Sequence, residues 1–265
     1  MSIVVTVMNM KGGVGKTTVC AHLGGILARR KYGGVRKNIL WIDYDPQFNL
    51  SQAFIRGPKY FELEENNKTC LQILQDPDVK LDPFQIQTPL TATPPKVAEL
   101  VWSTTNIYHL HIIPSTLDLM YVALGTSTGS LPIIEARFKK FIAQCRAEYD
   151  LIMIDCHPAG SILTRTSLHN PDHVLVPVAP QAFAARGVGL MERFIDANDG
   201  GATEADTTHC VQFDTAKRPR VGCREPNSRA REVRSVVPAA HDQEVQGLFG
   251  TQRRPRLRVG FWQTV

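Results

Sequence analysis

The octapeptide KGGVGKTT at residues 11–18 holds the residue types that bind a nucleotide phosphate. Its glycines let the backbone curl so that successive N–H groups point inward at an anion. Lys16 is placed to reach the β- and γ-phosphates, and the Thr17 hydroxyl to hold Mg²⁺. The usual G-x-x-x-x-G-K-[ST] spacing fails at its first position, where Met10 replaces glycine and Lys11 follows. A glycine-rich turn with incidental lysines is the alternative interpretation.

The surroundings of the octapeptide favour the phosphate-binding interpretation. The sequence predicts a strand over about residues 3–8 and a helix over about residues 16–30. A strand, a glycine-rich turn and a helix in this order give the loop its phosphate-binding context, and the helix adds its positive N-terminal end. We therefore assign nucleotide binding to the whole octapeptide, which is Lys11, Gly12, Gly13, Val14, Gly15, Lys16, Thr17 and Thr18.

Two further segments end in carboxylates. In residues 42–51 (IDYDPQFNLS), Asp43 and Asp45 follow an apolar run, and a carboxylate there can orient or deprotonate an attacking water. A solvated Asp-Pro turn is the other interpretation. In residues 151–155 (LIMID), Asp155 can reach Mg²⁺ through water, although aspartates at strand ends are also common turn residues.

The residues after Asp155 have plainer interpretations. We interpret Cys156 as a small core residue rather than a reactive thiol. We interpret His157 as a structural neighbour of the site rather than a catalytic base.

Repeated strand–helix units must position these groups. They predict an α/β fold with a doubly wound, mostly parallel sheet and helices on both faces, which the phosphate-binding loop makes P-loop NTPase-like. Ligands of such sheets bind beyond the carboxyl ends of the strands, so the three segments should meet there. Further strands are predicted at 38–43, 108–114, 150–155 and 173–178, and helices at 133–149 and 184–197. Residues 56–106 are predicted to be irregular, with turns at 57–58 and 94–95 and short helical pieces near 71–74 and 97–101.

The composition is that of a globular protein. The 265 residues are 43% hydrophobic and 21% charged, and no run approaches 18 consecutive apolar residues, so no membrane-spanning helix is expected. Six cysteines without a C-x-x-C pair indicate reduced thiols and a cytoplasmic location.

The regular alternation of predicted strands and helices stops after residue 199. Residues 200–265 contain no isoleucine, two leucines, and ten arginines to one lysine, and no window predicts a buried strand. They hold 11 Lys and Arg against 7 Asp and Glu, whereas residues 1–199 hold 19 against 18. We predict a P-loop ATPase domain at 1–199 and an irregular basic tail at 200–265. The tail is either a disordered basic extension or a degenerate segment produced by a reading-frame change. We favour the reading-frame change, which the nucleotide sequence across codons 195–205 would test.

Together these motifs resemble one family over about residues 1–198. KGGVGKTT resembles the deviant Walker A box of the ParA/MinD class of P-loop ATPases, and residues 43–49 resemble the D-x-D-P-Q-x-N switch of ParA-type partition ATPases. Residues 110–119 resemble the strand and turn that partition ATPases place between their switch regions. Residues 174–184 resemble the V-P-x-x-P-x-x-x-A junction between a strand and a helix in that family. The family usually continues D-x-P-P after the Walker B strand, whereas this chain reads Asp155-Cys156-His157-Pro158.

The resemblance implies an ATPase that partitions plasmid or chromosomal DNA, converting ATP and water to ADP and phosphate. It implies a catalytic set of Lys11, Lys16 and Asp45, with Asp45 positioning the water and Lys11 crossing the interface of an ATP-dependent homodimer to the partner's phosphates. It implies Mg²⁺ held by Thr17 and Asp155, with Asp43 supporting either the Mg²⁺ shell or the loop. The implied partners are non-specific DNA of the nucleoid and a ParB-type centromere-binding protein that stimulates hydrolysis.

Three alternatives compete. A MinD-like membrane-cycling ATPase predicts an amphipathic C-terminal helix, but Pro255 and Gly260 interrupt that pattern, so membrane binding is not expected. A relative of the nitrogenase iron protein needs cysteines placed to bridge two subunits, which Cys145 and Cys156 do not suit. A degenerate remnant would keep the nucleotide half of the fold and lose the rest.

Overall fold

The computed structural model of the chain describes residues 2–32, 34–77, 89, 91–104, 107–124, 131–158, 160–169 and 171–178, together with the backbone of 210–214 and 260–263. The predicted helix at 184–197 lies outside the described residues, as does most of the segment 200–265.

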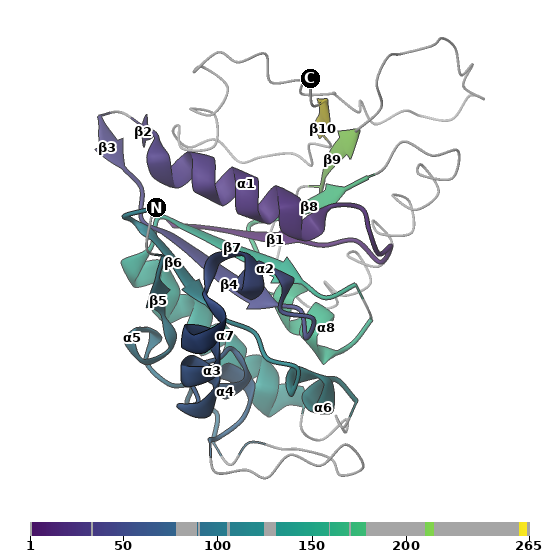
Figure 1. Cartoon of the computed structure of the whole chain (residues 1–265). Coiled ribbons are helices and arrows are strands. Elements are labelled where there is room, and N and C mark those ends of the chain that lie inside the picture. The colour runs from purple at the N-terminus through teal and green to yellow at the C-terminus, as the bar shows by residue number, and fades with distance from the viewer. Residues whose placement is uncertain are drawn as a thin grey trace, which may run out of the picture.

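An eight-stranded sheet runs through the molecule in the order β10-β9-β8-β1-β7-β4-β6-β5 (Figure 1). Its neighbouring strands are parallel except for the antiparallel pair β5–β6, which confirms the predicted mostly parallel sheet. The strands are β1 (Ile3–Val7), β4 (Ile39–Tyr44), β5 (Trp102–Ser103), β6 (Leu110–Ile113), β7 (Leu151–Cys156), β8 (His173–Pro177), β9 (Cys210–Asp214) and β10 (Gly260–Gln263). A separate hairpin pairs β2 (Lys31–Tyr32) with β3 (Val35–Arg36).

Side chains alternate between the two faces of the sheet, as the two-residue period of a strand requires. In β4, Leu40, Ile42 and Tyr44 belong to one buried apolar cluster, whereas Ile39 and Trp41 belong to the other. Because both clusters are built from every central strand, the strands are apolar on both sides, as expected for a parallel sheet covered by helices on both faces.

Helices cover the two faces. Helix α1 (Lys16–Arg29) lies across one face, and α7 (Leu131–Glu148) packs on the other (Figure 1). Helix α1 can lie close to the sheet because Gly24 has no side chain. A Cβ at this position would lie only 2.2 Å from Nε1 of the buried Trp41 ring. The remaining helices are α2 (Asn49–Phe54), α3 (Gly57–Glu65), α4 (Leu71–Leu74), α5 (Val97–Leu100), α6 (Leu119–Leu124) and α8 (Ile162–Leu168).

The structure contains elements that the sequence did not predict, including the hairpin β2–β3 and the helices α2, α6 and α8. It also differs from the prediction in two further regions. Gly57-Pro58, predicted as a turn, begins α3, where proline is favoured because the first helical N–H groups need no intrahelical partner. Residues 200–265, predicted as an irregular tail in which no window indicates a buried strand, contribute the strands β9 and β10, which extend the sheet beyond β8.

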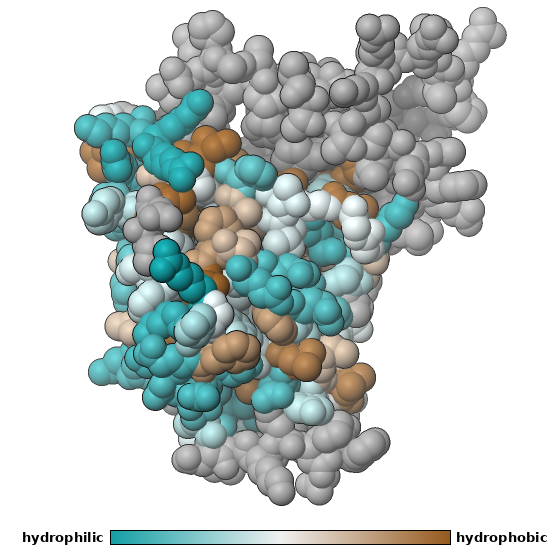
Figure 2. All heavy atoms as spheres, in the orientation of Figure 1, coloured by the Kyte–Doolittle hydropathy of each residue, from teal (hydrophilic) through white to brown (hydrophobic). Residues whose placement is uncertain are grey.

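The described surface has scattered apolar residues. Hydrophobic residues form separate groups among hydrophilic ones on the face shown in Figure 2. The large exposed ones are Met10, Ile26, Val35, Phe61, Tyr108, Leu117 and Leu124. Among the described helices, none combines the length and apolar character needed to cross a bilayer.

Candidate functional site

Three predicted segments meet at the carboxyl ends of three adjacent strands. The sheet order β1-β7-β4 brings together the glycine-rich loop after β1 and the carboxylates that end β7 and β4. Asp155 is directly opposite Val7 on one side and Asp43 on the other. The convergence that the parallel sheet predicted is therefore present in the fold.

The loop between β1 and α1 has the geometry of an anion cradle. Gly13 and Gly15 adopt φ values of 71° and 86°, in the left-handed region that other residues avoid. A Cβ on Gly12, Gly13 or Gly15 would meet no atom within 4 Å, so the space beside the loop is open. No side chain caps α1 and its first turn has no acidic residue, which leaves the helix N-terminus available to an anion. Lys16, the first residue of α1, is largely buried.

Asp155 is a buried carboxylate without a hydrogen-bond partner among the described residues. Its residue is 1% exposed, and neither carboxylate oxygen accepts a hydrogen bond of normal geometry from a described residue, although the Thr17 hydroxyl is close enough to lower the carboxyl pKa. Burial and the charge of Asp45 raise its pKa to about 7, against the opposing effect of the nearby Thr17 hydroxyl and Lys16 ammonium. An unpartnered buried carboxylate is costly, so its environment is suited to a cation.

Asp43 has one oxygen held by the protein and one without a partner. The backbone N–H and hydroxyl of Ser51 donate to its Oδ2 at 2.7 and 2.6 Å, and Ser51 Oγ accepts from the N–H of Ser115 at 2.9 Å. Its Oδ1 accepts no hydrogen bond from any residue that the structure describes. Burial, followed by the charge of Asp155, raises its pKa to about 8. Asp43 thus supports the start of α2 and still presents a free oxygen.

Asp45 is fixed in a turn after β4. The Ser115 hydroxyl and the Phe48 N–H donate to its backbone carbonyl at 2.7 and 2.8 Å. The Gln47 N–H and His157 Nδ1 each lie 3.0 Å from its Oδ1. Burial acts to raise its pKa, but these hydrogen bonds outweigh it and the net pKa is lowered. Asp45 is therefore ionised at neutral pH.

The residues present fit a magnesium-bound nucleotide. The open cradle suits phosphates, and the unpartnered oxygens of Asp155 and Asp43 suit the charge of Mg²⁺. The described residues hold no group of three or more His, Cys, Asp and Glu that could bind a metal by themselves. A Mg²⁺ site built from one hydroxyl, carboxylates and substrate phosphates is the usual arrangement for this ion.

The cysteines are buried in the core, whereas Lys11 is exposed on the surface. Cys145 and Cys156 are fully buried, as are the other described cysteines, Cys20 and Cys70, so none of the four is placed to bridge two subunits. Burial raises the pKa of Cys156 to about 12, as expected for a core residue. Lys11 is exposed, and its N–H donates to Asn9 Oδ1 at 2.9 Å.

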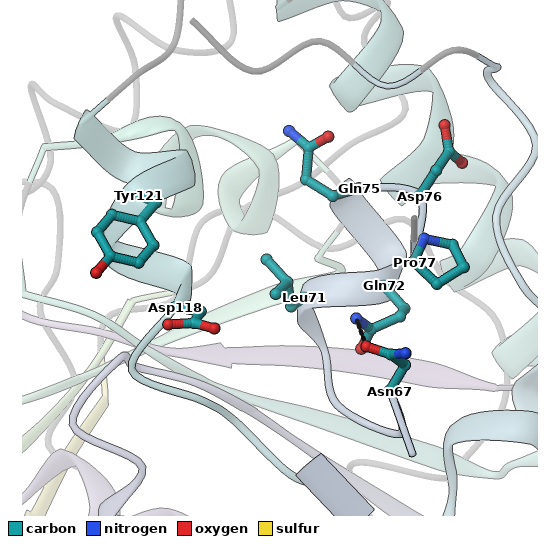
Figure 3. Close-up of a pocket in the computed structure, with 8 residues that line it drawn as sticks. All are labelled: Asn67, Leu71, Gln72, Gln75, Asp76, Pro77, Asp118 and Tyr121. Carbon is teal, nitrogen blue, oxygen red and sulfur yellow. Dashed lines mark hydrogen bonds between the residues drawn. The ribbon is translucent and has the colours of Figure 1, made fainter. Parts of the chain in front are cut away.

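A second hollow lies away from this edge. It measures about 300 Å³ and is lined from α4 and α6, where Leu71, Gln75, Asp118 and Tyr121 surround it (Figure 3). The Gln75 amide is buried without a hydrogen-bond partner among the described residues. None of the residues predicted to bind nucleotide lines this hollow.

The fold and the loop define a P-loop NTPase. Residues 2–200 match the AAA domain family AAA_31, and the chain belongs to this ParA/MinD-type family. It is 30% identical over 193 residues to the sporulation initiation inhibitor protein Soj of Bacillus subtilis, covering 72% of this chain and 64% of that protein. It is 27% identical over 205 residues to the chromosome-partitioning ATPase Soj of Treponema pallidum, covering 75% of this chain and 65% of that protein. The chain spans about half to two thirds of the length of such curated relatives.

Solved structures share the fold. A plasmid partition protein from Borrelia burgdorferi superposes with a TM-score of 0.64 at 19% identity, covering 84% of this chain and 83% of that one. Cobyrinic acid a,c-diamide synthase from Mycobacterium smegmatis, solved with a bound ATP analogue and magnesium, gives 0.59 at 23% identity, covering 80% and 75%. The predicted membership of the ParA-type partition ATPases is confirmed by the family match and the Soj relatives.

Proposed function

We propose that this protein is an ATPase that partitions plasmid or chromosomal DNA. The observation that carries the proposal is the position of the unpartnered Asp155 carboxylate beside Lys16 and Thr17 at the open glycine loop. A buried carboxylate that accepts no hydrogen bond of normal geometry from a described residue would be stabilised by a bound cation. The name of the Treponema pallidum relative supports the link to chromosome partitioning.

Each residue has a role in this mechanism. The N–H groups of residues 12–18 and the Lys16 ammonium hold the phosphates and withdraw the charge that develops during phosphoryl transfer. Thr17 and Asp155 would hold Mg²⁺, with Asp43 beside them, and the ion would neutralise phosphate charge. Asp45, ionised and fixed by its turn, accepts a proton from the attacking water or orients that water in line with the γ-phosphorus.

The partner interactions belong to the same proposal. Lys11 is exposed at the start of the loop, where it can reach the phosphates of a second copy and make dimerisation depend on bound ATP. The dimer would bind nucleoid DNA in the cytoplasm without sequence preference, and a ParB-type protein would stimulate hydrolysis and release it.

Nucleotide binding is tested by titrating the full chain with a fluorescent ATP analogue in Mg²⁺. Lys16→Ala is expected to weaken binding at least roughly 100-fold, because it removes a charge-assisted contact to the phosphates. His22→Ala, an exposed change on the same helix, serves as the control and should bind like the wild type. An unchanged affinity of Lys16→Ala for the ATP analogue would refute the proposed nucleotide site.

The proposed DNA binding is tested separately by gel retardation of DNA fragments of unrelated sequence, with and without ATP.

A further inference from the structure

His157 contacts the carboxylate proposed to position the attacking water. Its Nδ1 lies 3.0 Å from Oδ1 of Asp45, and both side chains are largely buried, at 17% and 11% exposed. The strand register explains the contact. Asp43 and Asp155 are opposite each other on β4 and β7, so the residues two positions further on, Asp45 and His157, leave the two strands side by side.

The two carboxylate oxygens of Asp45 differ in their hydrogen bonds. Oδ1 accepts from both the Gln47 N–H and His157, whereas no described residue donates to Oδ2. Because an ionised carboxylate can only accept hydrogen bonds, Nδ1 of His157 is the donor in this pair. Rotation of the carboxylate would break both hydrogen bonds on Oδ1, so the direction of Oδ2 is fixed.

We propose that His157 is a positioning residue for ATP hydrolysis, which holds Asp45 so that Oδ2 faces the attacking water. The inference rests on the proposed function. A proline, the residue that the resembled family usually has at this position, carries no side-chain donor and could not make this contact. The hydrogen bond between His157 and Asp45 is therefore specific to this chain, in which a histidine stands where the family usually has a proline.

The size of the effect follows from what the contact fixes. A misplacement of a reacting or orienting group by about 1 Å can cost roughly 100-fold in rate. The Gln47 N–H still holds Oδ1 when His157 is removed, so we expect a smaller loss of roughly 10-fold. Because His157 is not expected to touch the phosphates, the affinity for ATP should not change.

The test is single-turnover hydrolysis of ATP by the full chain in excess, with the dissociation constant of ATP measured in parallel. His157→Asn places its amide N–H near the position of Nδ1, whereas His157→Gln places it near Nε2. We expect His157→Ala and His157→Gln to lower the rate constant roughly 10-fold and His157→Asn to stay within about threefold of wild type, all with unchanged affinity. Thermal melting of each variant reports whether it folds.

Several outcomes would overturn the inference. One is a wild-type rate in His157→Ala, and another is an equal loss in all three variants, which would indicate a role in folding or packing. A parallel loss of ATP affinity would place His157 at the phosphates instead. If the wild type binds ATP without hydrolysing it, the proposed function fails and the inference with it, whereas hydrolysis by the wild type with no effect of His157 overturns the inference alone.

Discussion

Replacing Asp155 by asparagine is expected to stabilise the nucleotide-free protein at alkaline pH, although the residue is proposed to serve the reaction. The wild-type carboxylate is 1% exposed, accepts no hydrogen bond of normal geometry from a described residue and lies beside Asp43, so ionising it in the folded state is costly. The amide has nearly the same shape and carries no charge.

The magnitude and its pH dependence follow from the pKa of Asp155. Burial raises that pKa from 3.8 to about 7, so between these values the folded protein binds a proton that the unfolded chain has released. The free energy of unfolding of the wild type therefore falls as the pH rises through this window. At about 1.4 kcal/mol per pH unit, the full cost is on the order of 4 kcal/mol above pH 8. Imperfect accommodation of the amide reduces the expected net gain of Asp155→Asn to about 2 kcal/mol.

Urea unfolding at pH 5 and pH 8 without nucleotide measures this gain. We expect Asp155→Asn to exceed the wild type at pH 8 and to approach it at pH 5. The control is Asp150→Asn at the other end of β7, where the carboxylate accepts from Lys37 at 3.2 Å and from the Asn38 N–H at 2.9 Å. Its removal should instead destabilise the protein by up to about 1 kcal/mol. The reasoning is refuted if Asp155→Asn is less stable than the wild type at pH 8.

Three further predictions concern packing, hydrolysis and dimerisation. Gly24→Ala should lower the free energy of unfolding by about 1–3 kcal/mol because its methyl group would overlap Trp41. Gly25→Ala, whose added Cβ would meet no atom within 4 Å, should leave the free energy of unfolding unchanged or raise it by up to about 1 kcal/mol. Chemical denaturation measures both variants, and equal effects would contradict the close contact of Gly24 with Trp41. Asp45→Ala should bind ATP normally but hydrolyse it roughly 100-fold more slowly in single turnover. A wild-type rate would show that another group positions the attacking water. Lys11→Ala should keep monomeric ATP binding but lose ATP-dependent dimerisation in light scattering, and a normal dimer would remove its proposed role.

The central sheet and the loop were predictable from the sequence because their signals are local. A parallel strand buried on both faces is an apolar run, as in β4 and β7, and the loop motif requires a strand before it and a helix after it. Short helices were harder to recognise. Asp45-Pro46 and Gly57-Pro58 both have the composition of turns, yet the first closely precedes α2 and the second begins α3. The stability of such short helices comes from tertiary packing.

Contacts between segments distant in the sequence were not predictable. The pairing of His157 with Asp45 depends on the register of β7 against β4, which the sequence does not specify residue by residue. The same holds for the Ser51–Asp43 hydrogen bonds, which join the end of a strand to a helix that was not predicted. The departure from D-x-P-P at His157 was visible in the sequence, but its partner was visible only in the structure.

The most direct test of the account is a crystal structure of the protein with Mg²⁺ and a non-hydrolysable ATP analogue. We predict that the phosphates lie against the N–H groups of residues 12–18, with Lys16 on the terminal phosphates and Asp155 directed at the metal ion through water. Nucleotide bound elsewhere, or Asp155 directed away from the ion, would contradict the proposal that this edge of the sheet is an ATPase site.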